Sequence, residues 1–302
     1  MAKRRRKHKT GGLFAGALAI VAIAAGAWAV IPTASGGGEE EQQTVAAPYE
    51  VAAKPSFTSP QKPVKPKPSG NERRIEIPAK MHGTPERILS RYAYTLSFNR
   101  ETNQPNWVAW CLDSSEAAGG HIGRGEFAAD PDIPAPHRVE PSDYTRSGCD
   151  RGHMAPAADM KFSPRAMREC FYMSNICPQN HSLNGGPWSR LETACRRWAS
   201  ETGKVYIVCG PIFGPGKHKT IGKNHKIPVP RAFFKCVYAV GKGGKPRAIG
   251  FVMANNASRQ TLASAATSVD SVEALTGIDF FPALPAKTEK AVEATFSLAD
   301  WQ

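Results

Sequence analysis

An uncharged apolar run over residues 11–31 is the feature that most restricts how this chain can fold. As a helix, the run would rise about 31 Å, close to the roughly 30 Å thickness of a bilayer core. Six Lys and Arg residues precede it within residues 1–10. By the positive-inside rule, this pattern predicts a basic cytoplasmic N-terminus over 1–10 and a transmembrane signal anchor over 11–32.

A cleaved signal peptide is the alternative interpretation of the same run, because Ala27, Trp28 and Ala29 form a small-x-small pattern. We favour the anchor, since the run is longer than the 7 to 15 residues usual for a signal core. Both interpretations predict that the rest of the chain is extracytoplasmic, either anchored in the membrane or secreted into the periplasm or the medium.

A Pro-rich linker is predicted over residues 33–80. It begins with three glycines and three acids over 36–41 and continues with Pro48, Pro55, Pro60, Pro63, Pro66 and Pro68. This composition leaves little with which to build a core, and the Lys-Pro alternation at 62–68 is typical of an extended spacer. One folded domain over 81–302 is therefore expected, although 302 residues would allow about two average domains.

Apolar stretches separated by turn residues predict the strands of this domain. They lie at 92–98, 107–112, 205–209, 233–240 and 248–253, and the first two are expected to pair. A helix is predicted from Pro187, because Trp188, Leu191, Cys195 and Trp198 are spaced 3, 4 and 3 residues apart. Strands and helices without regular alternation indicate a single α+β domain.

Seven cysteines are an odd number, so at least one thiol is free in any disulfide scheme. The sequence has no CxxC pair, which argues against a structural zinc ribbon. Many of these cysteines lie within apolar segments, where a thiol behaves as a small buried hydrophobe. Buried thiols and disulfides both remain open.

Side chains suited to catalysis gather between Asp150 and Glu192. In an extended segment, Asp150 and Gly152 would face one side and Arg151 and His153 the other. Gly152 would allow an unusual backbone angle or a close approach. Further amide side chains follow within 174–179 and 183–192. Taken singly, Asn175, Gln179 and Asn184 would be interpreted as turn or cap residues.

Together these segments resemble the DNA/RNA non-specific endonucleases, the family that includes mitochondrial endonuclease G and secreted bacterial nucleases. The resemblance rests on a DRGH motif, an SN pair, a PQ pair and an N-x3-W-x2-LE pattern, and it extends over about residues 88–285. The matching residues are Asp150, Arg151, Gly152 and His153; Ser174 and Asn175; Pro178 and Gln179; and Asn184, Trp188, Leu191 and Glu192.

The resemblance implies a ββα-metal (His-Me finger) nuclease fold with a central antiparallel sheet flanked by helices. A strand bearing His153, a second strand ending near Asn175 and a helix from about Pro187 would form the ββα unit. One ion would lie between them.

The resemblance also implies roles for individual residues. His153 matches the general base, Asn184 the metal ligand, and Glu192 a catalytic carboxylate that holds water on the ion. Arg151 matches the motif arginine beside the phosphate, with a catalytic and a substrate-binding role. Three further matches complete the set: Arg124 and Gln179 as substrate-binding residues, Asn175 as a catalytic residue that shapes the site, and Asp150 as a support behind the metal ligand.

The implied activity is metal-dependent hydrolysis of DNA and RNA without sequence or sugar specificity, leaving 5′-phosphate and 3′-hydroxyl ends. A neutral imidazole is suited to take a proton from water, and Mg²⁺, or Mn²⁺ in its place, prefers oxygen ligands. On a continuous helix, Asn184 and Glu192 would be about 12 Å apart. They would not both contact the ion unless the turn at Gly185 and Gly186 folds Asn184 back.

Charge supports a polyanionic partner. Six of the 13 net positive charges lie in residues 1–10, and residues 33–78 carry six acids and six bases, so +7 remains on residues 79–302. The sequence has no helix-turn-helix, zinc-finger or RNA-recognition motif. Both DNA and RNA are therefore the expected partners, bound through their phosphates and without sequence preference. The membrane is expected to bind the N-terminal segment, a homodimer is compatible with the resemblance, and no protein partner is identifiable.

Two rival functions differ in class. The first is a membrane-tethered, nuclease-like domain that binds nucleic acid without cleaving it. The intact set of His153, Asn184 and Glu192 disfavours this function. A zinc peptidase is disfavoured more strongly, because there is no HExxH motif and no two histidines after residue 100 are spaced i, i+4.

Overall fold

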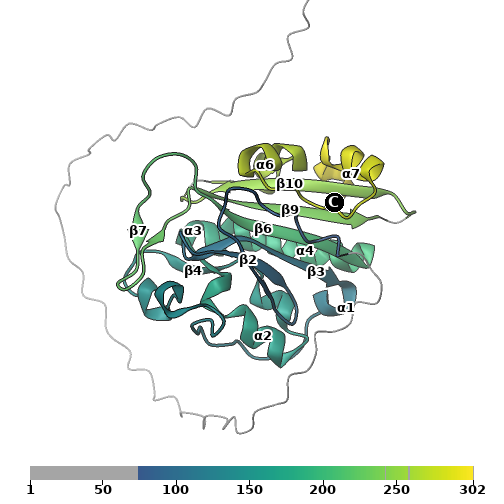
Figure 1. Cartoon of the computed structure of the whole chain (residues 1–302). Coiled ribbons are helices and arrows are strands. Elements are labelled where there is room, and N and C mark those ends of the chain that lie inside the picture. Colours follow the sequence, from purple (N-terminus) through teal and green to yellow (C-terminus); the bar gives the residue numbers. More distant parts are fainter. Residues whose placement is uncertain (1–73, 242, 258, 302) are drawn as a thin grey trace, which may run out of the picture. The chain divides into compact units, whose positions relative to one another are not determined.

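The computed structural model describes residues 74–241, 243–257 and 259–301 (Figure 1). The predictions for residues 1–10 and 11–32, and most of the predicted linker, lie outside the described residues. No helix within the described part of the chain is long and apolar enough to cross a membrane. Ile75 and Ile77 pack against buried residues of the domain, so the end of the predicted linker belongs to the fold.

A seven-stranded sheet with antiparallel neighbours forms the centre of the domain (Figure 1). In spatial order its strands are β1 Arg87–Ser90, β2 Thr95–Asn99, β3 Gln104–Asp113, β6 Lys204–Ile212, β9 Ala232–Val240, β10 Pro246–Ala254 and β11 Ala266–Thr267. All five strands predicted from apolar stretches are present. The expected pairing of the first two is also present, with Thr95 opposite Ala109.

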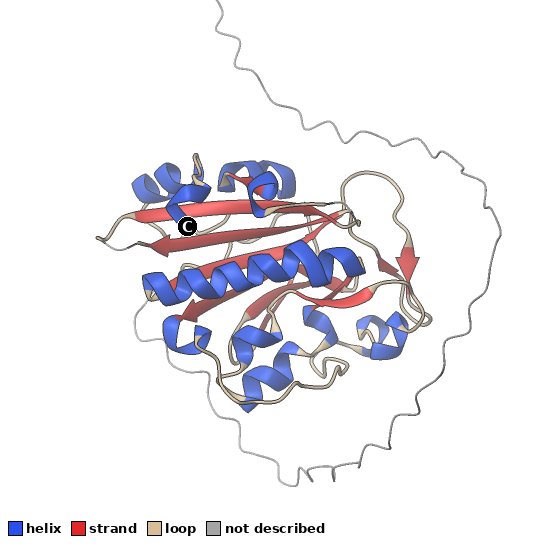
Figure 2. Cartoon of the chain, turned by 180° about the vertical axis from the view of Figure 1, so that it is seen from behind, coloured by secondary structure: helices blue, strands red, loops and turns tan. Residues whose placement is uncertain are grey.

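Both faces of the sheet are covered, and alternate side chains enter different cores. Val108 and Trp110 of β3 belong to the core under α4 Ser189–Thr202, whereas Trp107 and Ala109 belong to the core under α6 Val269–Thr276 and α7 Ala286–Glu293. Figure 2, which views the chain from behind, shows α4 as the long helix that crosses one face of the sheet. The helices α6 and α7, labelled in Figure 1, pack on the other face. The predicted α+β class, with an antiparallel sheet flanked by helices, is confirmed.

Short elements connect these layers. The helices are α1 Ser114–Ala117, α2 Pro164–Cys170, α3 His181–Leu183 and α5 Leu262–Ala265, and two-stranded sheets pair β4 Asp150–His153 with β5 Ile176–Gln179 and β7 Thr220–Ile221 with β8 Ile227–Pro228. The 3-10 turns are η1 Ala135–His137, η2 Pro141–Tyr144, η3 Ala157–Met160, η4 Met173–Asn175 and η6 Leu298–Trp301, and η5 Asn184–Trp188 is a π turn.

The helix α4 begins two residues later than Pro187 and buries the stripe that predicted it. Leu191, Cys195 and Trp198 are at most 1% exposed. Spacings of 4 and 3 residues place the three side chains on one face of a helix. The remaining faces of α4 carry Arg, Glu, Ser and Thr, so burial of this stripe against the sheet holds the helix in place.

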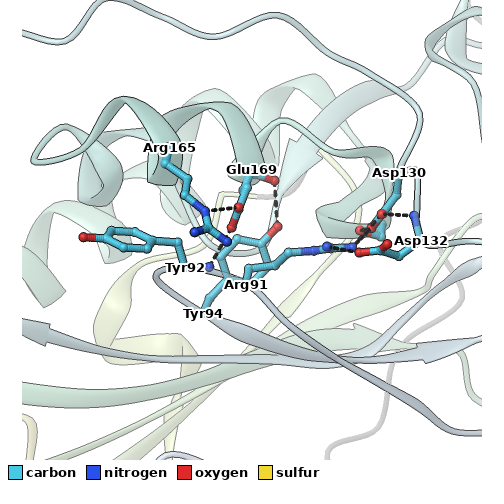
Figure 3. A network of polar contacts seen from close by, with 8 residues as sticks. Arg91, Tyr92, Tyr94, Asp130, Asp132, Arg165 and Glu169 are labelled. Atoms are coloured by element: carbon cyan, nitrogen blue, oxygen red, sulfur yellow. Dashed lines mark hydrogen bonds and ion pairs between the residues drawn. The ribbon is translucent and has the colours of Figure 1, made fainter. Parts of the chain in front are cut away.

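A polar network joins α2 to the edge of the sheet (Figure 3). Arg91 pairs with Asp130 and Asp132, while the carboxylate of Glu169 accepts hydrogen bonds from the Tyr92 backbone N–H and the Arg165 guanidinium. The Tyr94 hydroxyl donates to the Glu169 carbonyl over 2.7 Å. These contacts hold the last turn of α2 in place. Glu169 lies two residues before Phe171, which lines the cavity described below.

All seven cysteines are free thiols, five of them buried. Burial raises the pKa of Cys170 and of Cys195 to about 12, so both thiols stay protonated at neutral pH. The sequence left both disulfides and buried free thiols open, and the structure has free thiols.

Candidate active site

The DRGH segment is strand β4, which pairs antiparallel with β5, and α4 follows through two short turns. Asp150 lies opposite Gln179 and His153 opposite Ile176. The prediction that the second strand ends near Asn175 is wrong, because that strand begins at Ile176. Asn175 instead closes η4, whose backbone turns the chain into the strand.

Gly152 is required by a close approach and not by an unusual backbone angle, since its φ is not positive. A Cβ at this position would lie 2.0 Å from Oε1 of Gln179. Gln179 is fully buried. The expected substrate-binding role of Gln179 does not fit this placement, because its side chain packs across β4 and does not reach solvent.

Asn175 is also fully buried, and its amide is occupied by backbone partners. Its Oδ1 accepts from the Ala155 N–H over 2.9 Å, and its Nδ2 donates to the carbonyls of Ala155 and Cys170 over 2.9 and 2.8 Å. These bonds fix the chain two residues after His153. The expected catalytic role does not fit a side chain without access to substrate, so we assign Asn175 to holding the site's shape.

His153 lies against two aromatic rings. Its ring centroid is 5.3 Å from that of Phe127 and 4.7 Å from that of Phe171, with Phe171 edge-on. Its Nε2 atom is buried and has no hydrogen-bond partner among the described residues. Burial, with a smaller contribution from the Arg124 guanidinium, lowers the pKa of His153 to about 4. The imidazole is therefore neutral at physiological pH.

A cavity of about 490 Å³ brings four of the predicted residues together: Arg124, His153, Asn184 and Glu192 all line it. They come from the loop before β4, from β4 itself, from the turn η5 and from the first turn of α4. This cavity is the candidate active site.

Asn184 and Glu192 line the same cavity, and the helix is interrupted between them. Backbone angles at Gly186 (φ −113°, ψ −112°) are not helical, and η5 is a π turn. The two residues therefore do not lie on one continuous helix.

Asp150 orients the Asn184 amide. Its Oδ2 accepts from Asn184 Nδ2 over 2.9 Å and lies 3.0 Å from Nδ1 of the exposed His181. Because the amide nitrogen is engaged by Asp150, the amide oxygen is the atom left for a ligand. An amide oxygen and a nearby carboxylate are donors of the kind that Mg²⁺ prefers.

The two predicted arginines are placed differently. The guanidinium of Arg124 lies 5.8 Å from the Phe171 ring and lines the cavity. Arg151 donates to the Pro141 carbonyl over 2.8 Å, lies 5.3 Å from the Phe127 ring and does not line the cavity. The expected contact of Arg151 with phosphate is therefore not supported by its position, and Arg124 is the better candidate.

A buried charge cluster that the sequence reasoning did not assign to the site lies beneath Glu192. Lys235 is fully buried, with its Nζ 4.6 Å from the Trp188 ring and 4.9 Å from the Trp110 ring. Asp159 is buried beside it, 3.0 Å from Arg196. The signal in the sequence was a lysine in the middle of the apolar stretch 233–240.

The electrostatic effect of this cluster falls on Glu192. Burial raises the pKa of Glu192 to about 7, and Asp159 adds to the rise. Lys235 and Arg196 oppose it. Burial lowers the pKa of Lys235, but acidic neighbours, among them Glu192 and Asp159, outweigh that effect and raise it. The charged form of Lys235 is therefore favoured next to the carboxylate that lines the cavity.

A protein-family model described as DNA/RNA non-specific endonuclease matches residues 74–287. Similar curated proteins include the mitochondrial nuclease EXOG of Danio rerio, 36% identical over 219 residues, which cover 67% of this chain and 64% of the relative. The mitochondrial nuclease of Saccharomyces cerevisiae is 31% identical over 270 residues, covering 83% and 80%. Human mitochondrial endonuclease G is 33% identical over 212 residues, covering 66% and 71%.

Among solved structures, a chain of the crystal structure of the EndoG/EndoGI complex is similar, with a TM-score of 0.66 and 28% identity. The match covers 73% of this chain and 96% of that one. The chain spans less than two thirds of the Danio rerio relative's length. The fold expected from the motifs is thus found in a solved nuclease structure.

These relatives correct one expectation. They are named as mitochondrial nucleases. The predicted extracytoplasmic placement of the domain, whether membrane-anchored or secreted, is contradicted. That placement was inferred from the composition of residues 1–32, which lie outside the described residues.

Proposed function

Because the chain belongs to the DNA/RNA non-specific endonuclease family, we propose that it is a metal-dependent nuclease that hydrolyses phosphodiester bonds of DNA and RNA. The observation that carries this proposal is the cavity in which His153, Asn184, Glu192 and Arg124 converge. A base, oxygen donors for a cation and a guanidinium for phosphate are the groups that such a hydrolysis needs.

His153 is the proposed general base. A neutral imidazole accepts a proton, and the lowered pKa keeps the ring neutral throughout the physiological range. Since Nε2 is buried, the ring nitrogen left for a water molecule in the cavity is Nδ1. Phe127 and Phe171 restrict the ring's rotation, so the accepting nitrogen keeps its direction.

Asn184 and Glu192 are the proposed holders of one Mg²⁺ or Mn²⁺ ion, Asn184 through its amide oxygen and Glu192 through water. The fit rests on the Asp150 hydrogen bond, which turns the Asn184 oxygen away from Asp150. When bound, such an ion would neutralise charge on the phosphate oxygens and lower the pKa of water near the leaving oxygen. Lys235 stabilises the ionised form of Glu192, which is the form that can hold a cation's water.

Arg124 is the proposed phosphate contact. Its guanidinium presents several N–H donors in a fork that matches phosphate oxygens. Arg124 is exposed, whereas His153 is half-buried and Phe171, which also lines the cavity, is fully buried. Attack of the activated water on phosphorus with departure of the 3′ oxygen would leave 5′-phosphate and 3′-hydroxyl ends.

Substrate scope follows from the kind of contacts available. The cavity offers groups for phosphate and metal, and phosphate contacts carry no sequence information. The +7 charge of residues 79–302 supports binding to a polyanion. DNA and RNA are the proposed partners, and assembly as a homodimer stays a prediction.

The test is cleavage of plasmid DNA and of RNA by the purified protein with Mg²⁺, with Mn²⁺ and with chelator. Wild type should degrade both substrates only with metal, and His153→Ala should lose about 10²- to 10⁴-fold in rate, the usual contribution of a general base. The exposed His82, which does not line the cavity, provides the matched control variant His82→Ala. Binding without cleavage by the wild type would support the nucleic-acid-binding alternative and overturn the proposal.

A further inference from the structure

Three carboxylates meet on the side of the sheet opposite the cavity. Asp270 and Glu273 lie three residues apart on α6, and Glu293 is the last residue of α7. Their ligand oxygens all lie within 4.8 Å of one another. The neighbouring residues Val272 and Val292 belong to the core under α6 and α7, so the sheet separates this cluster from the core under α4.

Of the three carboxylates, Glu293 is the one that is buried with an unpaired side-chain oxygen. Its side chain is only 5% exposed, and its Oε1 atom is buried with no hydrogen-bond partner among the described residues. A buried polar atom without a partner costs about 1 to 3 kcal/mol, and more when it is charged. Glu293 also lies at the C-terminal end of a helix, where the helix dipole disfavours a negative charge.

The neighbours of Glu293 add to this cost. Burial, followed by Glu273 and Glu289, raises its pKa to about 8. Burial also raises the pKa of Glu273, while the Phe280 N–H that donates to Glu273 Oε1 acts in the opposite direction. Among residues 74–241, 243–257 and 259–301, no Lys or Arg forms an ion pair with Asp270, Glu273 or Glu293.

We propose that Asp270, Glu273 and Glu293 form a second divalent-cation site, of the calcium type, that fastens α6 to α7. The oxygen-only donor set is the one that hard cations prefer. Three ligand oxygens within 4.8 Å of one another are close enough to surround one such ion. Ca²⁺ accepts carboxylates in a flexible geometry, whereas Mg²⁺ demands a near-ideal octahedron and gives up its waters reluctantly, so a site made of three carboxylates suits Ca²⁺ better.

The experiment measures thermal unfolding of metal-free full-length protein with and without added Ca²⁺, together with the number of Ca²⁺ ions bound in equilibrium dialysis. Ca²⁺ at about 100 times its dissociation constant should raise the wild-type melting temperature by roughly 5 to 10 °C. Glu293→Gln should abolish that shift and bind one ion fewer.

Two further variants separate this site from the catalytic one. Asn184→Ala, altered in the proposed nuclease centre, should retain the Ca²⁺-induced shift, and Glu293→Gln should retain cleavage in Mg²⁺. Glu201→Gln, which removes a carboxylate from the last turn of α4, is the matched control and should behave as wild type.

Equal Ca²⁺-induced shifts in Glu293→Gln and wild type, or no shift in wild type, would overturn the second site. Should Glu293→Gln fail to fold, Asp270→Asn replaces it, since Asp270 is exposed and its substitution leaves the core intact. In Asp270→Asn the Ca²⁺ concentration at half-maximal shift should rise at least tenfold, and an unchanged value would contradict the proposal.

Discussion

At the scale of single residues, the environment of His153 determines its charge. Burial between Phe127 and Phe171 disfavours the imidazolium, and the Arg124 guanidinium disfavours it further. With a pKa of about 4, the ring is available as a base well below neutral pH. An unperturbed histidine would lose that function near pH 6.5.

At saturating metal the cation favours the ionised form of Glu192, so the acid limb of kcat/KM should report His153. Its midpoint should lie near pH 4 to 5, and Arg124→Met should move that midpoint upward. The stability of the fold should depend on pH through the same group. Unfolded protein binds a proton at His153 near pH 6.5, whereas folded protein binds it only near pH 4. The contribution of His153 to the free energy of unfolding is therefore present above pH 6.5 and is lost as the pH falls toward 4. Rate profiles from pH 4 to 9 at saturating metal check the first expectation. An acid limb centred at pH 6.5 in the wild type would contradict it.

Lys235 is the residue whose removal should disturb the site from beneath. Lys235→Met keeps the length of the side chain but leaves Glu192 and Asp159 without the charge that faces them. Breaking a buried charge pair typically costs about 3 to 5 kcal/mol, so the free energy of unfolding in denaturant should fall by that order. The Mg²⁺ concentration for half-maximal rate should also rise. The exposed Lys219→Met is the control, and an unchanged Mg²⁺ requirement in Lys235→Met would remove Lys235 from the site.

At the scale of elements, the pairing of β4 with β5 depends on one glycine. A Cβ at residue 152 would overlap the Gln179 side chain, so Gly152→Ala should destabilise the protein by about 1 to 3 kcal/mol and lower its activity. Because the obstacle is a side chain, the double variant Gly152→Ala/Gln179→Ala should recover part of the loss. Unfolding curves for the two single variants and the double variant measure this coupling. Strictly additive losses would show that the contact is not the cause.

Elements were predictable where periodicity reports burial directly. The strands at 205–209 and 233–240 and the helix with Leu191, Cys195 and Trp198 follow from local patterns, and all are present. The position of β5 was not predictable to the residue, because the SN and PQ pairs identify a segment and not the hydrogen bonds that begin a strand. Asn184 and Glu192 line one cavity with a non-helical Gly186 between them, and no local sequence pattern specifies that conformation.

At the scale of the whole molecule, the sheet divides the domain into a catalytic side and a side with the acidic cluster. The net positive charge of residues 79–302 predicts binding to phosphates irrespective of sequence. His153→Ala protein in chelator should bind two unrelated DNA duplexes with equal affinity, and log K should fall linearly with log salt, with a slope of about −0.9 per phosphate neutralised. Fluorescence anisotropy from 50 to 300 mM salt measures both, and a tenfold preference for one duplex would contradict the expectation.

The sequence by itself determined the family, the α+β class and the main elements, because short motifs and hydrophobic periodicity are local properties. It also pointed to the residues around His153. Only the tertiary structure decided which of them meet: Arg124, Asn184 and Glu192 line one cavity with His153. Asn175 and Arg151 instead bond to backbone groups of the domain, and Gln179 is buried against Gly152. The physical reason is that burial and hydrogen-bond partners are set by segments far apart in the chain, such as Lys235 beneath Glu192 and Gln179 across Gly152.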